Sequence, residues 1–541
     1  MRIIGYHFAN GILTDSDSWV QDKEGYLTFL LSKSSPDTIQ IAWHLDWMVA
    51  ELLRCLEFQE WEGKKLLDNG KIYTTPWTLS YFPGRLLTID RGFGAGHPFA
   101  ILASAAQYQV PTFDDIPTEH DKLYEYCIKK AKEAKELGEK VYQALTELDL
   151  HPKSLISPIA VYQKEILSKV DLPTVDDYPD EIGEWAYECC KGSWVECFKR
   201  GHWKETWDYD INSAYPSVLR RLPDLRRGTW SKRQDTTAIL GFNRTNVDMT
   251  ADLHPILFRN KDDENFTPVG MREECLTWNE CNFIDQRKLG KVESLESWGW
   301  TPTKSVVYPL ASIIDSLYQE REKAVGNSIK RDVIKRILSG IYGKLLEIYL
   351  HDDDPMGPLF NPVWAAYVEA DSRLEVANFC YKNDIVPIHI AVDGILSDKP
   401  LPVAKNGIGS WQLSSIGPAL VFGSGAVAQK NHKGIGDFAL DYDEMISFMK
   451  INPDTISYTM KKFSPMTLPK ALSQNKWDKL GQLLQVERTV DFGYETKRCW
   501  PKMYSVAKDL LEREPIESVA WDVSLVSGIS QTLEYKEAQD E

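Results

Sequence analysis

One acidic residue near the middle of the chain is the first candidate for chemistry. Asp210 lies in the segment Trp207-Asp-Tyr-Asp-Ile-Asn-Ser-Ala-Tyr-Pro-Ser217, where apolar and acidic side chains alternate before a turn. This period of two predicts a strand with Asp208 and Asp210 on one face and with Tyr209 and Ile211 on the other. A carboxylate at the end of such a strand can bind a divalent metal for nucleotidyl transfer. For this segment alone, a turn-forming or helix-capping aspartate stays the simpler interpretation.

A second aspartate follows in a segment that predicts a strand, a tight turn and a strand. Its sequence is Ile388-His-Ile-Ala-Val-Asp-Gly-Ile-Leu396, with Asp393-Gly394 expected at the tip. Two aspartates at neighbouring strand ends can share two Mg²⁺ ions, which activate an attacking 3′-hydroxyl and stabilise the departing pyrophosphate. An isolated Asp-Gly turn is usually structural, so this chemistry requires Asp210 and Asp393 to lie together.

A basic helical hairpin is expected between the two aspartates. The pattern predicts helices from Ile313 to Ala324 and from Ser328 to Leu346, with Ser328 as the cap of the second. Its basic residues are Arg321, Lys323, Lys330, Arg331, Lys335, Arg336 and Lys344. Lys335 and Tyr342 lie two turns apart on one face, where they could bind a triphosphate and stack on a base or sugar. A solvated amphipathic hairpin is the structural alternative.

Together these segments resemble family B DNA polymerases, most closely the compact bacteriophage-type branch that includes the protein-primed enzymes. Asp210-Ile-Asn-Ser-Ala-Tyr-Pro216 is similar to motif A, and Lys335-Arg-Ile-Leu-Ser-Gly-Ile-Tyr-Gly343 is similar to motif B. Asp393 matches the second aspartate of motif C, and the three motifs occur in family order. Upstream, Lys191-Gly-Ser-Trp194 is similar to the Tyr-x-Gly-Gly segment that contacts the template strand in this family.

The resemblance implies a role for each matched residue. Asp210 and Asp393 would bind two Mg²⁺ ions, with Mn²⁺ as the alternative ion and the Ile211 carbonyl as a further ligand. A deoxynucleoside triphosphate would be bound by Ser213, Ala214, Tyr215, Arg321, Lys323, Lys335 and Tyr342. Primer-template DNA would be bound by Lys191, Gly192, Ser193, Gly343, Lys430 and Lys497. Tyr215 would lie under the deoxyribose and exclude a 2′-hydroxyl.

The chain departs from the family pattern in three segments. In the Tyr-x-Gly-Gly-like segment, Cys190 stands in place of the Tyr and Ser193 replaces the second Gly. In motif C, Ala391 replaces the first aspartate and Gly394 replaces the serine. In motif B, Ser339 and Gly340 replace Asn and Ser. Because the first aspartate of motif C is the less essential carboxylate in the family, the metal site is expected to survive.

The resemblance also implies a mixed α+β fold: a right-hand polymerase with palm, fingers and thumb, preceded by a ribonuclease H-like exonuclease-type domain. The expected divisions are an exonuclease-like domain at 1–171, a linker at 172–189, palm with motif A at 190–231, a palm insertion at 232–303, fingers with motif B at 304–350, palm with motif C at 351–410, and thumb and tail at 411–541. In protein-primed relatives an insertion at 232–303 contacts the terminal protein, so a terminal protein is a candidate partner beside other replication factors.

The N-terminal domain is expected to have lost its proofreading chemistry. Thr38 to Leu53 indicates a strand, a turn and a helix, and Asp46 matches a carboxylate of the second exonuclease motif. The first strand, Met1 to Ala9, has no Asp-x-Glu, and Lys130 stands where Tyr126-Cys-Ile-Lys-Lys130 should end in aspartate. Two-metal hydrolysis needs several carboxylates, and a lysine cannot replace one.

Composition limits the remaining alternatives. The chain has 541 residues with 43% apolar content, enough for several packed cores. It has no run of 18 apolar residues and no secretory signal, and its nine cysteines form no regular framework, so we expect a cytoplasmic protein without membrane contacts. A net charge of −17 argues against a nonspecific nucleic-acid coat. A viral or plasmid replicon is what the resemblance suggests as its origin.

The main interpretation is a DNA-directed DNA polymerase that extends a primer 3′ end by two-metal transfer and lacks 3′–5′ proofreading. A translesion, priming or terminal-transferase-like polymerase of the same fold is one alternative. An inactive polymerase-like scaffold that only binds DNA is another. A scaffold has no physical need for Asp210, Asp393, Lys335 and Tyr215 together, which favours an enzyme.

Overall fold

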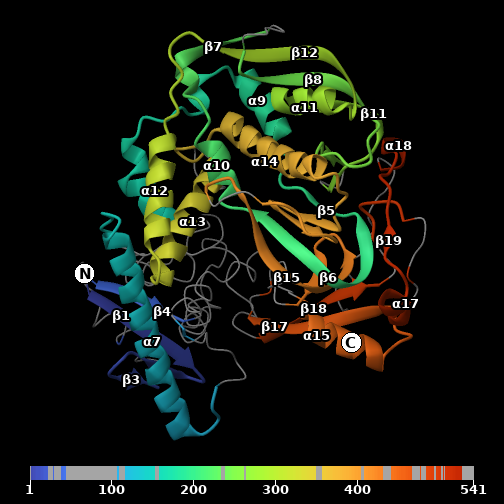
Figure 1. Cartoon of the computed structure of the whole chain (residues 1–541). Coiled ribbons are helices and arrows are strands. Elements are labelled where there is room, and N and C mark those ends of the chain that lie inside the picture. Colours follow the sequence, from blue (N-terminus) through green and yellow to red (C-terminus); the bar gives the residue numbers. More distant parts are fainter. Residues whose placement is uncertain are drawn as a thin grey trace.

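The computed structural model of the chain describes residues 2–21, 29, 38–43, 107–108, 116–152, 158–232, 238–260, 264–348, 356–403, 407–430, 440–465, 476, 483–492, 495–500, 504 and 506–526. Figure 1 shows a four-stranded sheet at the top, a larger sheet below it and an N-terminal unit at the lower left. Within the described part of the chain, no helix is both long and apolar enough to cross a membrane.

The larger sheet, called the central sheet here, has the strand order β16-β15-β6-β14-β13-β5, and β19 pairs with β6 beside it. Its strands are β5 (Val195–Cys197), β6 (Lys199–Ile211), β13 (His389–Ala391), β14 (Gly394–Ser397), β15 (Trp411–Gly423), β16 (Ala426–Gln429) and β19 (Ile516–Glu517). Tyr209 and Ile211 of β6 pack into a core with helix α14 (Pro362–Lys382). Asp208 and Asp210 therefore lie on the other face of β6, as the alternation predicted.

The two helices predicted between the aspartates are present as α12 (Ala311–Lys323) and α13 (Ser328–Lys344), which pack against each other. The predicted cap is wrong by one residue. The Asn327 side chain caps α13, accepting a hydrogen bond from the backbone N–H of Lys330 at 3.0 Å, and Ser328 is already helical. The chain leaves α12 through Gly326 at φ +84°, a conformation that glycine adopts readily, and this places Asn327 at the non-helical cap position.

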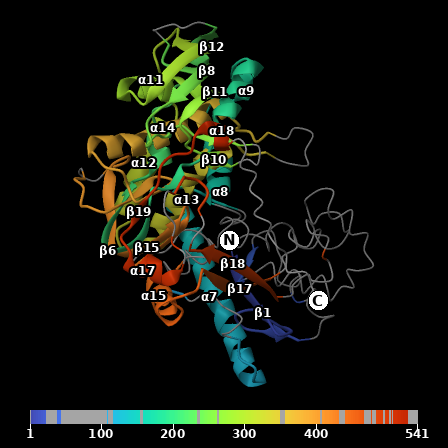
Figure 2. The same cartoon turned by 90° about the vertical axis from the view of Figure 1, so that its right-hand side faces the viewer.

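The four-stranded sheet at the top, called the upper sheet, has the order β11-β8-β12-β7. Its strands are β7 (Gly228–Ser231), β8 (Leu240–Met249), β11 (Gly270–Thr277) and β12 (Gly290–Pro302). Helices α9 (Asp180–Cys189) and α11 (Trp278–Arg287) pack against it. Figure 2 shows this sheet at one end of the molecule and the N-terminal unit at the opposite end.

The expected linker at 172–189 is instead a packed segment. It contains a short 3₁₀ turn, η5 (Val175–Asp177), and helix α9, whose Ile182 and Trp185 are buried. Pro179 stands at the position just before α9, and Asp180 begins the helix. Proline and aspartate are common both in linkers and at helix starts, and the apolar spacing that follows them decides between the two.

The N-terminal unit is a small sheet of order β3-β2-β1-β4 covered by one long helix, α7 (His120–Thr146). Its strands are β1 (Arg2–Ala9), β2 (Ile12–Thr14), β3 (Trp19–Val20) and β4 (Thr38–Ala42), with β1 parallel to β4 and antiparallel to β2. The helix crosses close to β1 at Gly5. A Cβ on this glycine would lie only 2.2 Å from the Ala131 carbonyl oxygen, so the absence of a side chain allows the close approach. Lys130 is buried on α7 and pairs with Glu133 at 2.8 Å. Asp46 lies outside the described residues.

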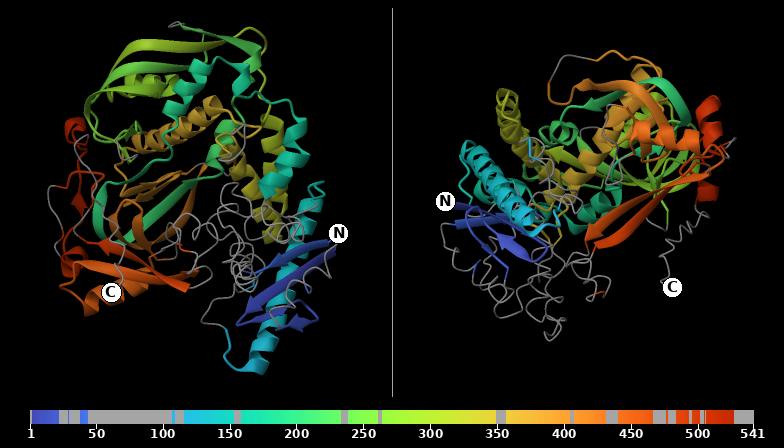
Figure 3. Two further views of the ribbon diagram at one scale, coloured as in Figure 1. Left: turned by 180° about the vertical axis from the view of Figure 1, so that it is seen from behind. Right: turned by 90° about the horizontal axis from the view of Figure 1, so that it is seen from below.

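The C-terminal part packs against the central sheet near the start of β6. It includes α15 (Tyr442–Ile451), α17 (Ala507–Glu512) and an antiparallel ribbon of β17 (Ser457–Pro465) and β18 (Leu483–Asp491). Seen from below in Figure 3, this ribbon and the N-terminal unit lie on different sides of the molecule. The other described elements are α8 (Pro158–Glu165), η4 (Leu167–Lys169), α10 (Ala214–Leu219), η6 (Leu225–Arg227), β9 (Phe258–Arg259), β10 (Asn265–Phe266) and α18 (Val523–Val526).

Candidate active site

The register of β6 against β14 brings the two predicted aspartates together. Asp210 pairs with Gly394 across the two strands, so Asp393, which precedes Gly394, lies beside Asp210. The backbone N–H of Ile211 donates to the Asp393 carbonyl oxygen at 3.0 Å and fixes the two strand ends to each other. Two carboxylates from segments far apart in the sequence therefore meet at one end of the central sheet.

The turn that carries Asp393 differs from the expected one. Ala391 pairs with Gly394, so the tip consists of Val392 and Asp393, and Gly394 already belongs to the strand. Val392 has φ +62°, an unusual conformation for a β-branched residue. Its backbone N–H donates to the Trp194 carbonyl oxygen at 2.8 Å, which helps to hold the turn. The strained residue is thus immediately next to the candidate catalytic aspartate, a place where proteins often store strain.

The aspartates border a cavity of about 220 Å³ on the open face of the central sheet. Asp208 lines it together with Asp210 and Asp393, although sequence reasoning gave Asp208 no role. Burial and, to a smaller degree, the nearby Asp210 charge raise the pKa of Asp208 to about 7. Burial and Asp210 also raise the pKa of Asp393 to about 6, against the opposing effect of Lys335. The cavity therefore gathers acidic groups whose ionisation is costly without a cation.

One carboxylate oxygen in this cavity fits a cation ligand. Oδ1 of Asp210 is buried and has no hydrogen-bond partner, which is costly for a carboxylate unless a cation or another donor approaches it. In the part of the chain that the structure describes, no three His, Cys, Asp or Glu side chains are gathered as a complete metal site. The two aspartates would supply only part of a coordination shell, in keeping with the waters and substrate phosphates that complete Mg²⁺ sites.

The helical hairpin brings positive charge to the same end of the sheet. The Arg321 guanidinium on α12 donates to the Ser213 hydroxyl at 3.0 Å, and Ser213 itself adopts a left-handed φ of 56°. Lys335 is exposed on α13 and lies close enough to lower the pKa of Asp393. Ala214 is buried at the start of α10. By contrast, Lys323 is exposed and pairs with Glu320 at 3.0 Å, and no contact ties it to the aspartates.

Two tyrosines form one wall beside the aspartates. The ring of Tyr215 on α10 lies edge-on to the ring of Tyr342 on α13, with 4.6 Å between their centroids. The Tyr215 hydroxyl is 3.0 Å from the Ser193 hydroxyl. Gly343, the next residue on α13, is exposed, and nothing lies within 4 Å of where its Cβ would be. The structure thus gathers residues of motif A, motif B and the Tyr-x-Gly-Gly-like segment.

The fold of the chain is similar to solved structures of a DNA polymerase. Phi29 DNA polymerase complexed with primer-template DNA and incoming nucleotide substrates aligns with a TM-score of 0.60 and 13% identity, over 91% of this chain and 100% of that chain. Its binary complex with primer-template DNA aligns with a TM-score of 0.62 at the same identity and coverage. The chain has the fold of phi29 DNA polymerase. No protein-family model and no curated protein sequence matches it.

The phi29 DNA polymerase fold confirms the expected mixed fold class. A shared fold can host different chemistry, so the chemistry of this site depends on its own residues. The motif B departure at Gly340 has a structural reason here. A Cβ on Gly340 would lie 2.7 Å from Cβ of Ile159, so this glycine lets α8 pack closely against α13.

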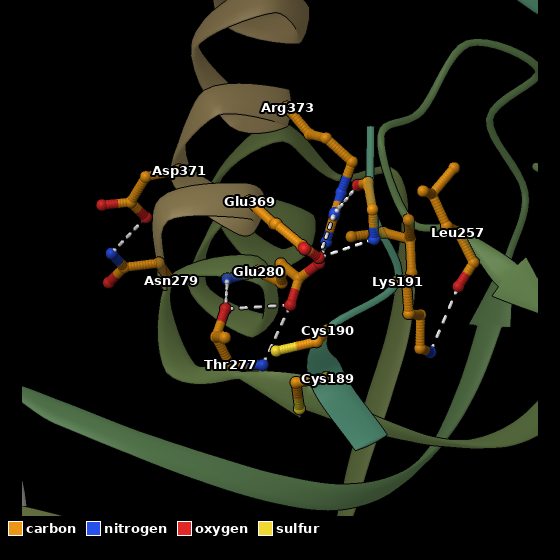
Figure 4. Close-up of polar contacts among 12 residues, drawn as sticks. Cys189, Cys190, Lys191, Leu257, Thr277, Asn279, Glu280, Glu369, Asp371 and Arg373 are labelled. Carbon is orange, nitrogen blue, oxygen red and sulfur yellow. Dashed lines mark hydrogen bonds and ion pairs between the residues drawn. The ribbon is translucent and has the colours of Figure 1, made fainter. Parts of the chain in front are cut away.

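Within the phi29 DNA polymerase fold, the predicted DNA-binding lysines have different surroundings. The Lys191 side chain is buried and forms an ion pair with Glu274. It also donates to the Leu257 carbonyl oxygen at 3.2 Å (Figure 4). The charge of this side chain is therefore already paired inside the protein, and the DNA contact of this segment, through Lys191 and the backbone, stays a prediction. Lys497 donates to the Val195 carbonyl oxygen at 3.1 Å, and Lys430 forms an ion pair with the exposed Asp443 at 3.0 Å.

Proposed function

We propose that the protein is a DNA-directed DNA polymerase that adds deoxynucleotides to the 3′ end of a primer. The observation that supports this best is the strand register that sets Asp210 beside Asp393, facing the Lys335 helix, within a phi29 DNA polymerase fold. In this proposal the central sheet is the palm, α12 and α13 are the fingers, and the C-terminal part is the thumb. The N-terminal unit is the exonuclease-type domain.

The residues at the sheet end suit two divalent cations, Mg²⁺ or Mn²⁺. Asp210 and Asp393 would bind them, together with the Ile211 carbonyl oxygen, and the unpartnered Oδ1 of Asp210 supports this assignment. Such ions, when bound, activate a 3′-hydroxyl and neutralise charge on a triphosphate. The raised pKa of Asp393, about 6, means that this carboxyl becomes a full ligand only once it has lost its proton.

The remaining residues would position the substrates. Arg321 and Lys335 would bind the triphosphate oxygens by charge-assisted hydrogen bonds. The Tyr215 ring, held at its hydroxyl by Ser193 and packed against the Tyr342 ring, would lie under the sugar and exclude a 2′-hydroxyl. Catalysis would then rest on alignment and on preorganised positive charge, the main resources of phosphoryl-type transfer.

Proofreading is not part of the proposed activity. Strand β1 contains no aspartate or glutamate, and Lys130 occupies the α7 position where the resemblance expects a carboxylate. Primer-template DNA and deoxynucleoside triphosphates are the proposed partners, and the upper sheet is the proposed contact for a terminal protein or another replication factor. Virus or plasmid replication is the setting that the resemblance suggests.

A primer-extension assay tests this function. Purified protein with Mg²⁺ or Mn²⁺ receives primer-template, primer alone or template alone, each with deoxynucleotides and separately with ribonucleotides. We expect template-dependent extension with deoxynucleotides that Asp210→Asn or Asp393→Asn abolishes. Asp149→Asn is the matched control, because Asp149 is 98% exposed and distant in sequence from the site.

Each alternative gives a different result in the same assay. Extension of primer alone indicates a terminal transferase, and products from template alone indicate a priming enzyme. DNA binding without any incorporation favours the scaffold. Incorporation that survives both aspartate substitutions contradicts the proposed site.

A further inference from the structure

A buried carboxylate on α14 contacts two segments of the proposed active site. Glu369 is only 3% exposed, and it accepts one hydrogen bond from the backbone N–H of Gly192 at 2.6 Å and another from the Tyr342 hydroxyl. Gly192 belongs to the Tyr-x-Gly-Gly-like segment, and Tyr342 belongs to motif B. Figure 4 shows Glu369 reaching from α14 toward the segment between α9 and β5 that carries Lys191. A single side chain thus joins three separate segments of the chain.

Arg373, one helical turn further along α14, contacts the same glycine. Its guanidinium donates to the Gly192 carbonyl oxygen at 2.6 Å and pairs with the buried Glu280 at 2.9 Å, and it lies 3.9 Å from Glu369. Glu280 also accepts hydrogen bonds from the backbone N–H and the hydroxyl of Thr277, each at 2.9 Å. These buried charges are paired and hydrogen-bonded, which is the condition for keeping them inside a protein.

The contacts close into a ring that includes the proposed sugar-excluding residue. From Glu369 the ring runs to the Tyr342 hydroxyl, from the Tyr342 ring to the Tyr215 ring at 4.6 Å, and from the Tyr215 hydroxyl to Ser193 at 3.0 Å. Ser193 follows Gly192, which donates its N–H to Glu369. Burial and the Glu369 charge raise the pKa of the Tyr342 hydroxyl, so this group stays protonated and donates.

We propose that Glu369 is a positioning residue that sets sugar and base-pair discrimination by holding Tyr342 and, through it, Tyr215. This inference rests on the proposed polymerase function. Hydrogen bonds to a charged acceptor are roughly twice as strong as neutral ones, so the Tyr342 ring loses its main anchor when the carboxylate is removed. A Tyr342 ring that can turn away no longer packs against the Tyr215 ring, and space opens beside the sugar.

The alternative is a purely structural role, in which Glu369 only neutralises Arg373. Two substitutions separate the roles. Tyr342→Phe removes the hydroxyl bond while Glu369, Arg373 and Gly192 keep their contacts, and Glu369→Ala removes both bonds of the carboxylate. Tyr381→Phe is the matched control, because the Tyr381 hydroxyl on the same α14 helix bonds to the Leu253 carbonyl oxygen instead.

The test measures kcat/KM for each deoxynucleotide, its ribonucleotide and a mismatched deoxynucleotide on primer-template DNA. We expect Tyr342→Phe and Glu369→Ala each to lower both discrimination ratios by about tenfold, with the double variant adding little because the two changes break the same contact. Tyr381→Phe should keep the wild-type ratios. A rise in KM for the deoxynucleotide larger than the fall in kcat is expected, since the substitutions disturb the pocket rather than the aspartates.

The outcomes separate this proposal from the proposed function. Incorporation by the wild type with unchanged discrimination in Tyr342→Phe overturns the role of Glu369 alone, and this variant decides the question even if Glu369→Ala does not fold. Strictly additive effects in the double variant also overturn it. No incorporation by the wild type overturns both the polymerase function and the role of Glu369.

Discussion

Replacing Asp371 with asparagine should stabilise the protein, and more at high pH than at low pH. The Asp371 carboxylate on α14 accepts a hydrogen bond from the Asn279 amide at 2.7 Å, but burial raises its pKa from 3.8 to about 6. Between these two values the folded state holds a proton that the unfolded state has lost. Stability that is present below about pH 3.8 is therefore lost as the pH rises to about 6.

The size of the effect follows from the difference between the folded and unfolded pKa of Asp371. A tenfold change in the proton equilibrium corresponds to about 1.4 kcal/mol, so keeping Asp371 in the folded state costs about 1.5 kcal/mol at pH 5 and about 3 kcal/mol at pH 8. Asparagine has nearly the same shape and keeps an oxygen for Asn279, but it carries no charge to bury. The Asp371→Asn substitution should therefore raise the free energy of unfolding by about these amounts. For 541 residues that unfold as one unit, about 3 kcal/mol raises the unfolding midpoint by about 3 °C, and by more for a smaller unit.

Thermal unfolding of metal-free protein from pH 5 to pH 8 measures this difference, with the exposed Asp149→Asn as the control. The midpoint gain of Asp371→Asn should grow with pH up to about pH 6 to 7 and then level off, while the control stays near the wild type. A gain that does not change with pH, or a loss of stability at pH 8, would contradict this prediction, because either result means that Asp371 is ionised in the folded protein without cost.

Three further predictions concern the sugar pocket, the N-terminal unit and proofreading. Tyr215→Ala should raise ribonucleotide incorporation while deoxynucleotide incorporation is largely kept, measured in the extension assay; unchanged discrimination removes Tyr215 from this role. Gly5→Ala should lower the unfolding free energy by about 2 kcal/mol or more, because its Cβ would overlap the α7 backbone. Gly343→Ala, on an open face of α13, is its control and should stabilise by up to about 1 kcal/mol in denaturant unfolding. A mismatched, end-labelled primer incubated with metal but without nucleotides should keep its length; shortening that Asp46→Ala abolishes contradicts the loss of proofreading.

Local patterns in the sequence predicted the elements of the site well. The apolar repeat and basic residues around Lys335 indicated both helices of the hairpin, and the alternation around Asp210 indicated the faces of β6. These patterns work because each side chain's direction follows from its own helix or strand. The prediction that Ser328 caps α13 also rested on a local pattern, and it was wrong. Asn327 and Ser328 both suit a cap, and the conformation of the glycine before them placed Asn327 at the cap position.

Apart from the pairing of Asp210 with Asp393, which the matched motifs implied, contacts between distant segments were beyond what the sequence alone could predict. Gly192 and Glu369 are 177 positions apart, and Lys191 and Glu274 are 83 positions apart. A lysine in a Tyr-x-Gly-Gly-like segment has the right charge for DNA whether its side chain turns outward or inward, and only the tertiary fold shows that it turns inward. The same holds for Glu369, which stands in a largely apolar helix without any local pattern that marks it.

The carboxylates of the cavity show why a comparison by position can mislead. When the motifs are compared position by position, Ala391 counts as the loss of a carboxylate, because the family motif has an aspartate there. When the side chains around the cavity are compared instead, the missing carboxylate has a counterpart, because Asp208 lines the same cavity as Ala391 and Asp210. Since β6 alternates, an aspartate two residues before Asp210 must share its face, and the cavity keeps three carboxylates although the motif C turn supplies only one of them. The chemistry of such a site follows from which side chains share a face and a cavity, and a motif records only part of that.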